Sequence, residues 1–341
     1  MKKVFFLFSM VWIVTIRGQN SFSTHINHSL ESKIDSIVQA GIQNKAYPGA
    51  QVLIFKNDSV RLNKSYGFHT YDSIVRVENH HLYDLASVTK ILASTLAFMK
   101  LYEDYNIDLD RKVSDYIPLI KYTNKKNSTF REVLSHQAGW LPYIEHQKTV
   151  RRKNGKLKGR TLSSIQNNRY TKPLTDSLFI HKSYKKKIMR RIKRTPVEKI
   201  GEYRYSGLLF FLLPDLVEKL SGQSFDQFLD SHFYDPMGIE RLTFNPSFKF
   251  PKEEIVPTEK DSLFRKTLVH GWVHDEAAGL MGGVSGNAGL FANASSLAKL
   301  LKMFLDCGQF EGKQFLKPET LELFTSRTYP NSDNRRGLGF D

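Results

Sequence analysis

The amino-acid sequence predicts a mixed α/β protein of the α+β kind, in which a helical part packs against an antiparallel sheet. Three observations carry this prediction. Two strand patterns occur early in the chain, segments with helical spacing of apolar residues dominate its middle, and strands and helices do not alternate as in parallel βαβ folds.

The N-terminal part is predicted to contain one helix and one β-hairpin. Apolar residues recur at helical spacing from 30 to 42, and Pro48-Gly49 ends that pattern. Residues 50–55 and 60–66 flank Asn57-Asp58, a pair that favours the tight turn of a hairpin.

Most later apolar segments have helical spacing. These segments are residues 85–99, 129–134, 208–220, 224–233 and 295–304. Pro214 interrupts the third segment and Gly222 follows its end, and Ser224 is the expected N-cap of the fourth. The single cysteine, Cys307, follows the last of these patterns, so we expect it to pack in the interior without a disulfide partner.

The formal net charge of +16 is confined to one segment. Residues 148–194 contain seventeen Lys or Arg and one acid, Asp176, whereas the rest of the chain has 33 bases and 33 acids. Lys185–Lys187 and Arg190-Arg191 surround Ile188 and Ile192, which predicts a basic amphipathic helix. The segment is either a solvated lid or a surface for an anionic envelope or an anionic substrate. Nucleic acid is disfavoured because no nucleic-acid-binding pattern accompanies the charge.

The first residues are typical of an export signal. Lys2 and Lys3 precede thirteen mostly apolar residues, too few to span a bilayer as a helix, and a polar run follows. A buried N-terminal helix is the alternative. We expect residues 1–18 to be a signal peptide cleaved near Gly18 to Asn20, and residues 24–341 to form an exported domain, periplasmic or secreted, without a transmembrane segment.

Ser87-Val88-Thr89-Lys90 begins an apolar helix and offers a nucleophile with a base. Residues three apart lie on one helix face, and the first turn of a helix favours developing negative charge. A lysine whose pKa is lowered by burial or by a neighbouring cation can take the serine proton. The alternative is a plain helix cap, because the same spacing occurs at Ser183/Lys186 and Ser296/Lys299.

Tyr205 is the second catalytic candidate. It lies in Tyr203-Arg204-Tyr205-Ser206-Gly207, directly before the apolar segment at 208–220. A tyrosine beside a lysine can relay a proton to a leaving group. The alternative is a tyrosine that packs in the core at the end of a strand.

Together, and in this order, these motifs resemble the serine β-lactamase and penicillin-binding-protein superfamily, specifically its class C and esterase-like branch. The resemblance is closest to serine hydrolase domains that some bacteria fuse to a glycoside hydrolase acting on cell-wall sugars. It covers roughly residues 34–341 and includes the N-terminal hairpin and the segments 82–90, 134–140, 205–238 and 282–291. It implies a β-lactamase/transpeptidase-like fold, with an antiparallel sheet flanked by helices and a helical subdomain.

By this resemblance, Ser87 is the acylated nucleophile, Lys90 is its base, and Tyr205 protonates the leaving group and then activates water. The backbone N–H of Ser87 supplies half of the oxyanion hole. The implied function is an exported serine hydrolase that cleaves an amide or ester of a small molecule or peptide, with cell-wall material as one candidate substrate. No cofactor is implied.

Two departures from the family pattern favour a different function. Gly207 occupies the position where the family has an Asn or Asp that contacts the lysine and the substrate amide. The third family motif, a Lys-Thr-Gly or His-Thr-Gly strand that follows a segment like 336–341, does not occur in the sequence, so we expect a domain that lacks its C-terminal strands. The alternative function is a catalytically degenerate module that binds cell-wall fragments or an anionic surface.

Metal binding is not predicted from the sequence. His274-Asp275-Glu276 offers three ligand types, but adjacent residues cannot all face one ion without distortion. We expect this triplet to form a polar wall near the active site. No partner can be identified from the sequence for His80-His81 or for His136.

Overall fold

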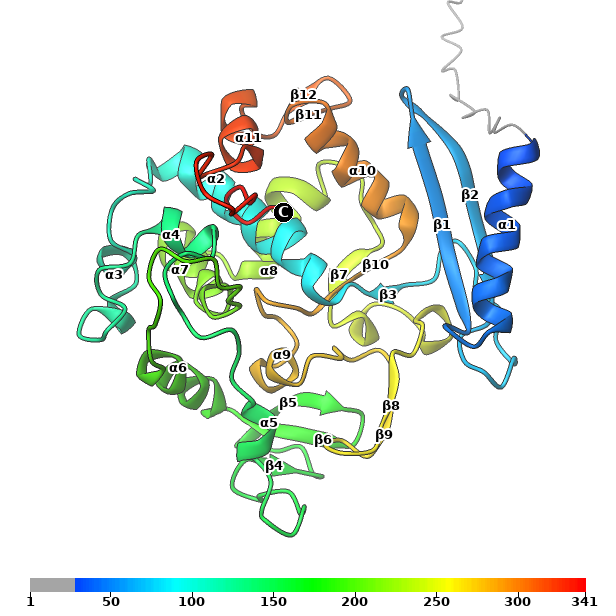
Figure 1. The fold of residues 1–341 in the computed structure, drawn as a ribbon. Helices are drawn as coiled ribbons and strands as arrows, with labels where there is room; N and C mark the ends of the chain where they lie inside the picture. The colour runs from blue at the N-terminus through cyan, green and yellow to red at the C-terminus, as the bar shows by residue number, and fades with distance from the viewer. Residues whose placement is uncertain (1–27) are drawn as a thin grey trace, which may run out of the picture.

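Figure 1 shows the computed structural model of the chain, which describes residues 28–341. The predicted signal peptide, residues 1–18, lies outside the described residues. Helices and small antiparallel sheets make up the described part, so the predicted α+β class is confirmed. Among residues 28–341, no helix is both long and apolar enough to cross a membrane.

The N-terminal hairpin consists of β1 (Gly49–Lys56) and β2 (Ser59–Gly67), which pair antiparallel as predicted. The turn residues Asn57 and Asp58 have φ of 49° and 54°. Two consecutive positive φ values match the right-handed twist of a hairpin, and Asn and Asp tolerate them better than most residues.

One helix covers each face of this hairpin (Figure 1). On one face, α1 (His28–Gln43) places Asp35 within 2.7 Å of both the Lys64 ammonium and the Tyr66 hydroxyl of β2. On the other face, α10 (Ala294–Leu305) donates the Ala294 N–H to the Gln51 side chain of β1 at 2.9 Å. The alternation of side chains along a strand explains why both helices find partners.

A three-stranded antiparallel sheet forms the centre of the molecule. Its middle strand is β10 (Leu290–Ala292), between β3 (Tyr83–Asp84) and β7 (Leu242–Phe244). The chain leaves β3 into a 3₁₀ turn (Ala86–Val88), a π-helical segment (Lys90–Thr95) and α2 (Leu96–Tyr105). The segment predicted as a helix at 85–99 is therefore helical from Ala86 onward, but with three different pitches. π-Helical turns are rare and occur mostly at functional sites.

Six further helices contribute side chains to the large core that contains the apolar residues of α2, and two of them, α7 and α11, pack directly against α2. Thr129 begins α4 with a capping box shared with Glu132. Pro214 opens a helix instead of interrupting one, because proline fits the first turn, where its missing N–H has no partner to lose. The bounds are α3 (Val113–Tyr116), α4 (Phe130–Leu134), α7 (Leu213–Ser221), α8 (Phe225–Leu229), α9 (Glu276–Met281) and α11 (Pro318–Thr325).

The basic segment 148–194 contains the predicted amphipathic helix and a sheet that the sequence did not predict. In α6 (Tyr184–Arg194), Ile188 and Ile192 are buried while Lys186 and Lys187 are exposed. The sheet has the strand order β4-β6-β5 and follows the short helix α5. The bounds are α5 (His146–Thr149), β4 (Leu162–Ser163), β5 (Tyr170–Thr175) and β6 (Leu178–His181).

Two small hairpins complete the fold: β8 (Glu259–Asp261) with β9 (Thr267–Val269), and β11 (Gln309–Phe310) with β12 (Lys313–Gln314). Cys307 lies between α10 and β11 and is exposed, so the prediction that it packs in the interior is wrong. The helix ends at Leu305, so Cys307 lies beyond it, in a turn where its φ is a left-handed 51°.

Candidate active site

Ser87 lies exposed on the 3₁₀ turn between β3 and the π-helical segment. The residue before it, Ala86, has a φ of 44°, a conformation that is strained for a residue with a Cβ. The half-buried carboxylate of Asp84 holds this turn, because it accepts the Ala86 N–H at 2.8 Å and the His274 N–H at 2.6 Å. The strained turn presents the Ser87 hydroxyl to solvent.

Lys90 lies below Ser87 and is 8% exposed. Its ammonium donates to the Ser87 Oγ at 2.8 Å and to the carbonyl oxygen of Asn287 at 2.9 Å. Burial lowers the pKa of Lys90 to about 8, partly opposed by the negative charge of Asp275. The structure thus brings the predicted nucleophile and base together, and the lowered pKa makes Lys90 easier to deprotonate.

The loop after α9 supplies the carbonyl that contacts Lys90. The Asn287 amide donates to Asp275 Oδ1 at 3.1 Å and its amide oxygen accepts from Ser285 at 2.7 Å. Asp275 also accepts the Ala278 N–H and so caps α9. The triplet at 274–276 therefore contributes Asp275 to the support of the lysine site.

Gly286 lets this loop approach the π-helical segment. The Ser94 hydroxyl donates to the Gly286 carbonyl at 2.7 Å, and a Cβ on Gly286 would lie 2.2 Å from the Phe210 carbonyl oxygen. Any side chain at position 286 would push the loop away from Lys90.

Tyr205 lies beside Lys90, and among residues 28–341 no hydrogen bond joins it to Ser87. The Lys90 ammonium is 5.9 Å from the centre of the Tyr205 ring, and the Arg336 guanidinium is 5.4 Å from the same ring. Within residues 28–341, none of the hydrogen bonds involves the Tyr205 hydroxyl, and 39% of the residue is exposed. The ring thus flanks the site, with its hydroxyl free to meet a ligand.

His136 positions the tyrosine segment, a role that the sequence did not reveal. Its Nδ1 accepts the Ser206 N–H at 3.1 Å, its carbonyl accepts the Arg204 N–H at 2.8 Å, and its ring centre is 4.5 Å from that of Tyr205. Burial, reinforced by the charges of Arg336 and Lys90, lowers the pKa of His136 to about 3. The ring is therefore neutral at pH 7 and can accept at Nδ1.

The backbone conformation of His136 is also unusual. His136 is buried with a φ of 62°, directly after α4, and only the folded chain shows that this turn faces Tyr205. The sequence motif at 134–140 marked the segment without assigning a function to the histidine.

Gly207 leaves open space beside the lysine. A Cβ on Gly207 would lie 3.7 Å from the Pro142 carbonyl oxygen and 3.8 Å from Lys90 Cε, both ordinary van der Waals distances. The Gly207 N–H donates to Pro142 at 3.0 Å. The backbone at 207 is thus held in place and has room for a side chain that could reach Lys90.

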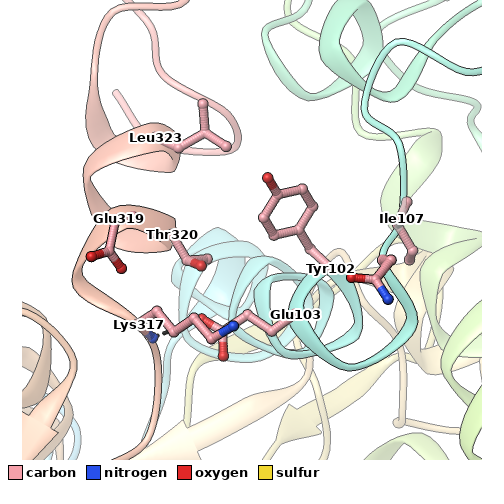
Figure 2. A pocket seen from close by; sticks show the side chains of 8 residues that line it. Tyr102, Glu103, Ile107, Lys317, Glu319, Thr320 and Leu323 are labelled. Carbon is pink, nitrogen blue, oxygen red and sulfur yellow. Dashed lines mark hydrogen bonds between the residues drawn. The ribbon is translucent and has the colours of Figure 1, made fainter.

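Cavities occur both near this site and away from it. One of about 200 Å³ is lined by Tyr203, Asn334 and Arg336, and the Arg336 guanidinium also lies over the Tyr205 ring. Figure 2 shows another, of about 560 Å³, between Tyr102 and Glu103 of α2 and Lys317 and Thr320 at α11. The residues that line the cavity in Figure 2 do not include Ser87, Lys90 or Tyr205, so this cavity is not part of the Ser87 site.

Comparison with known proteins agrees with this architecture. A family model described as Beta-lactamase matches residues 34–341. A protein of Escherichia coli (strain K12) with the provisional name D-alanyl-D-alanine carboxypeptidase is 30% identical over 325 residues, which cover 86% of this chain and 68% of that protein.

Solved structures show the same fold at lower sequence identity. The octameric penicillin-binding protein homologue of Pyrococcus abyssi matches with a TM-score of 0.65 and 20% identity, over 91% of this chain and 64% of that one. A class C beta lactamase matches with a TM-score of 0.60 and 18% identity, over 87% of this chain and 70% of that one. The fold predicted from the motifs is confirmed.

Proposed function

The chain belongs to the beta-lactamase family, and on that premise we propose that it is an exported serine hydrolase that cleaves an amide or ester through an acyl-enzyme. The observation that carries the proposal is the 2.8 Å hydrogen bond between Lys90 and the exposed Ser87. A buried lysine in contact with a solvent-facing serine hydroxyl is the arrangement that base-assisted nucleophilic attack requires.

The proposed reaction begins with proton transfer from Ser87 to Lys90. With a pKa of about 8, roughly a tenth of Lys90 is neutral at pH 7 and able to accept the proton. The Ser87 oxygen attacks the substrate carbonyl, and the N–H of Ser87 in the first helical turn stabilises the oxyanion. Tyr205 then protonates the leaving group, and water hydrolyses the acyl-enzyme.

A peptide is the first substrate class to test. Curated relatives carry the provisional name D-alanyl-D-alanine carboxypeptidase, and the chain spans 68% of the one at 30% identity. An exported enzyme of this kind acts in the cell envelope, periplasmic or secreted, where cell-wall peptides are available. Esters and β-lactams present the same carbonyl chemistry to Ser87.

The basic segment 148–194 is proposed to face an anionic partner in the envelope. Its helices α5 and α6 pack against α9, whose N-terminal Asp275 supports the Lys90 site. In the described part of the chain, acids form ion pairs with two of its seventeen bases, Lys148 with Glu145 and Lys185 with Asp215. The other cations are left to attract anionic polymer or headgroups to this side of the site.

Labelling with a fluorescent fluorophosphonate or a fluorescent penicillin tests the enzyme. Wild-type protein is expected to form a covalent adduct that Ser87→Ala abolishes. Ser183→Ala is the matched control, because Ser183 has the same spacing to Lys186 as Ser87 has to Lys90. Equal labelling of the wild type and Ser87→Ala, or no labelling of either, contradicts the proposal.

Gly207 favours a second candidate, a catalytically degenerate module that binds cell-wall fragments or an anionic surface. Without a side chain at 207, Lys90 lacks one polar neighbour that the family pattern includes. This candidate predicts that muropeptides bind with the same affinity to the wild type and to Ser87→Ala, without turnover by either, as measured by calorimetry and by product analysis.

A further inference from the structure

A cationic cavity of about 500 Å³ lies along α6, where this helix packs against the 3₁₀ turn η3 (Pro118–Ile120). Five bases at helical spacing line it: Lys182, Lys185, Lys186, Arg190 and Lys193. The lining has one carboxylate, Asp215, which pairs with Lys185 at 2.5 Å. Among the described residues, no acid forms an ion pair with the other four bases, so the cavity has an excess of positive charge.

A mainly apolar cavity of about 190 Å³ adjoins the cationic one. Leu119 of η3 and Asp215 in the first turn of α7 line both cavities. The other apolar lining residues come from the segment around η3 and from the start of α7: Tyr116, Ile117, Pro118, Leu212 and Leu216. The two cavities together form an amphipathic groove, called the α6 groove below, with a cationic end along α6 and an apolar end between η3 and α7.

Tyr122 adds an exposed aromatic ring beside the α6 groove. It follows η3 by two residues and is 88% exposed, more than any other large apolar side chain in residues 28–341. The loop that carries Tyr122 is tied to the end of α6, because the Thr195 carbonyl accepts from the Asn124 amide at 3.0 Å and from the Lys125 ammonium at 2.5 Å. Tyrosine, with an apolar ring and a polar hydroxyl, is enriched where membranes meet water.

We propose that the α6 groove and Tyr122 form a docking surface for a membrane rich in anionic phospholipid. The bases along α6 bind lipid phosphates, while the apolar end of the groove and the Tyr122 ring contact the chains beneath the headgroups. This inference rests on the proposed function, because it names the anionic partner of the basic segment 148–194 as a lipid.

The apolar end of the groove favours a lipid over a soluble polyanion. A polyanion without apolar groups can pair with the bases of α6 but leaves Leu119 and Tyr122 in contact with water. An anionic phospholipid carries a phosphate and hydrocarbon chains in one molecule, in the same order as charge and apolar surface follow each other along the groove. Covering the apolar end adds to the electrostatic attraction.

The docking is peripheral, because α6 keeps its own apolar side in the protein core. Ile188 and Ile192 are both 0% exposed, so α6 does not insert as an isolated amphipathic helix does. Only the groove and Tyr122 are left to enter the interface. Binding should therefore depend mainly on charge and weaken as salt is added.

The position of α6 also relates the docking surface to the candidate active site. The helix packs against α9, whose N-cap Asp275 accepts a hydrogen bond from Asn287, the residue whose carbonyl contacts Lys90. Figure 1 shows α6 on the opposite side of the molecule from β1 and β2. A chain docked through α6 therefore holds its Ser87 site near the membrane and its N-terminal hairpin away from it.

Flotation of the full chain with lipid vesicles, at about 0.1 M salt, tests the cationic end of the groove. Wild-type protein should bind phosphatidylcholine vesicles with about one third phosphatidylglycerol at least roughly tenfold more tightly than pure phosphatidylcholine vesicles. The pure vesicles also measure binding by the apolar N-terminal residues, which all variants share. Lys182→Gln with Arg190→Gln should weaken binding to the anionic vesicles about thirtyfold, at roughly fivefold per charge.

The matched control removes two bases that do not line the groove. Lys187→Gln with Arg194→Gln changes exposed bases of the same helix and should stay within about threefold of the wild type, because the Debye length at this salt is about 10 Å. Equal weakening by the two pairs of substitutions overturns the proposal.

A second pair of variants tests the apolar end without a change in charge. Leu119→Ser with Tyr122→Ser should weaken binding to anionic vesicles about fivefold and leave binding of soluble polyphosphate unchanged. Tyr71→Ser with Ile74→Ser, at exposed positions in the loop after β2, is the matched control and should leave both kinds of binding unchanged. Tyr122→Ser alone, at a fully accessible position, should show part of the effect even if Leu119→Ser lowers the melting temperature.

Two further results overturn the inference: equal binding of wild-type protein to anionic and pure phosphatidylcholine vesicles, or no effect of Tyr122→Ser, alone or with Leu119→Ser, on anionic vesicles. Binding of polyphosphate without binding of anionic vesicles would overturn lipid docking while leaving an anionic partner for the basic segment. Fluorophosphonate labelling of wild-type Ser87 in buffer without vesicles reports on the hydrolase separately.

Discussion

Lysine serves opposite purposes in the Ser87 site and in the basic segment 148–194. Lys90 is 8% exposed, and its ammonium lies between a serine hydroxyl and a backbone carbonyl. On α6, Lys186, Lys187 and Arg190 extend into water, and only the apolar side of the helix is buried.

The difference is one of solvation. Burial of its ammonium lowers the pKa of Lys90 to about 8 and makes it a base. This base acts on one group, the Ser87 hydroxyl. Cations that keep their water act together and at a distance, by raising the local concentration of anions. The two regions should therefore respond differently to substitution, salt and pH.

The largest expected effect comes from Lys90→Met, which keeps the length of the side chain and removes the base. The rate of Ser87 labelling should fall by about 10²–10⁴, the usual contribution of a general base. Lys186→Met, on the exposed face of α6, is the matched control and should label at the wild-type rate. Labelling by Lys90→Met within threefold of the wild type contradicts a base role for Lys90.

Lys90→Met should label more slowly than the wild type, but its folded state should be more stable. The folded pKa of Lys90 lies below the unfolded value of 10.5, so the unfolded chain binds more protons between about pH 8 and 10.5. Burial of Lys90 therefore costs stability below pH 8, and this cost disappears as the pH rises through that window. Lys90→Met should accordingly melt at a higher temperature than the wild type at pH 7.

The next largest expected effect is on the binding of anionic vesicles by the basic segment. Replacing Lys186, Lys187 and Arg190 together by Gln should weaken binding to vesicles rich in anionic lipid about a hundredfold at low salt, at about 1 kcal/mol per charge. The control replaces three exposed lysines elsewhere, Lys33, Lys56 and Lys266, by Gln. Binding that is unchanged between 50 and 500 mM salt, or lost equally in both triple variants, contradicts the electrostatic role.

A buried histidine directly before the basic segment, His146, makes the fold sensitive to acid. Burial and the neighbouring Arg191 lower the pKa of His146 to about 4, against 6.5 for the unfolded chain. The unfolded state binds the extra proton, so stability is fully present above pH 6.5 and falls as the pH drops toward 4, by up to about tenfold in the folding equilibrium per pH unit.

His146→Leu should therefore flatten the decline in melting temperature between pH 6.5 and 4. The apolar side chain fits a buried position beside Phe211, where His146 Nε2 has no hydrogen-bond partner among the described residues. His28→Leu, at an exposed position, should leave the decline unchanged. A slope in His146→Leu equal to that of the wild type would show that another group carries the acid sensitivity.

The pH profile of labelling should follow Lys90. The neutral fraction of a group with a pKa of about 8 rises about fivefold between pH 7 and pH 8, and the rate of labelling should rise with it. The rate of labelling, measured from samples quenched at several times at each pH from 6 to 10, gives the profile. A flat profile over this range contradicts the assignment of Lys90 as the proton acceptor.

The smallest expected effect is a gain of function at position 207. Gly207→Asn should raise the rate of labelling by a penicillin about twofold to tenfold, since one hydrogen bond contributes about 0.5–1.5 kcal/mol. The site has room for a Cβ, so the melting temperature should stay close to that of the wild type. Gly207→Ala is the control, because it fills the same space without an amide, and equal rates in both variants would exclude a polar effect.

Local sequence determined the hairpin, most helix positions and the contact between Ser87 and Lys90. Asn57-Asp58 accepts a positive φ at both turn positions, so the turn could be read without its surroundings. Ser87 and Lys90 are three residues apart, and a helical backbone alone brings them together. The charge of segment 148–194 is a count of residues and needs no fold.

Tertiary structure decided what these residues experience. The pKa of Lys90 depends on the loop at Asn287, which is 197 residues away, and the position of Tyr205 depends on His136 across a separation of about 70 residues. His69 and His81 meet only because the chain reverses after β2. Sequence spacing predicts contacts within one helix or hairpin, whereas burial, and with it the acid–base chemistry of Lys90, arises only when distant segments exclude water from the same place.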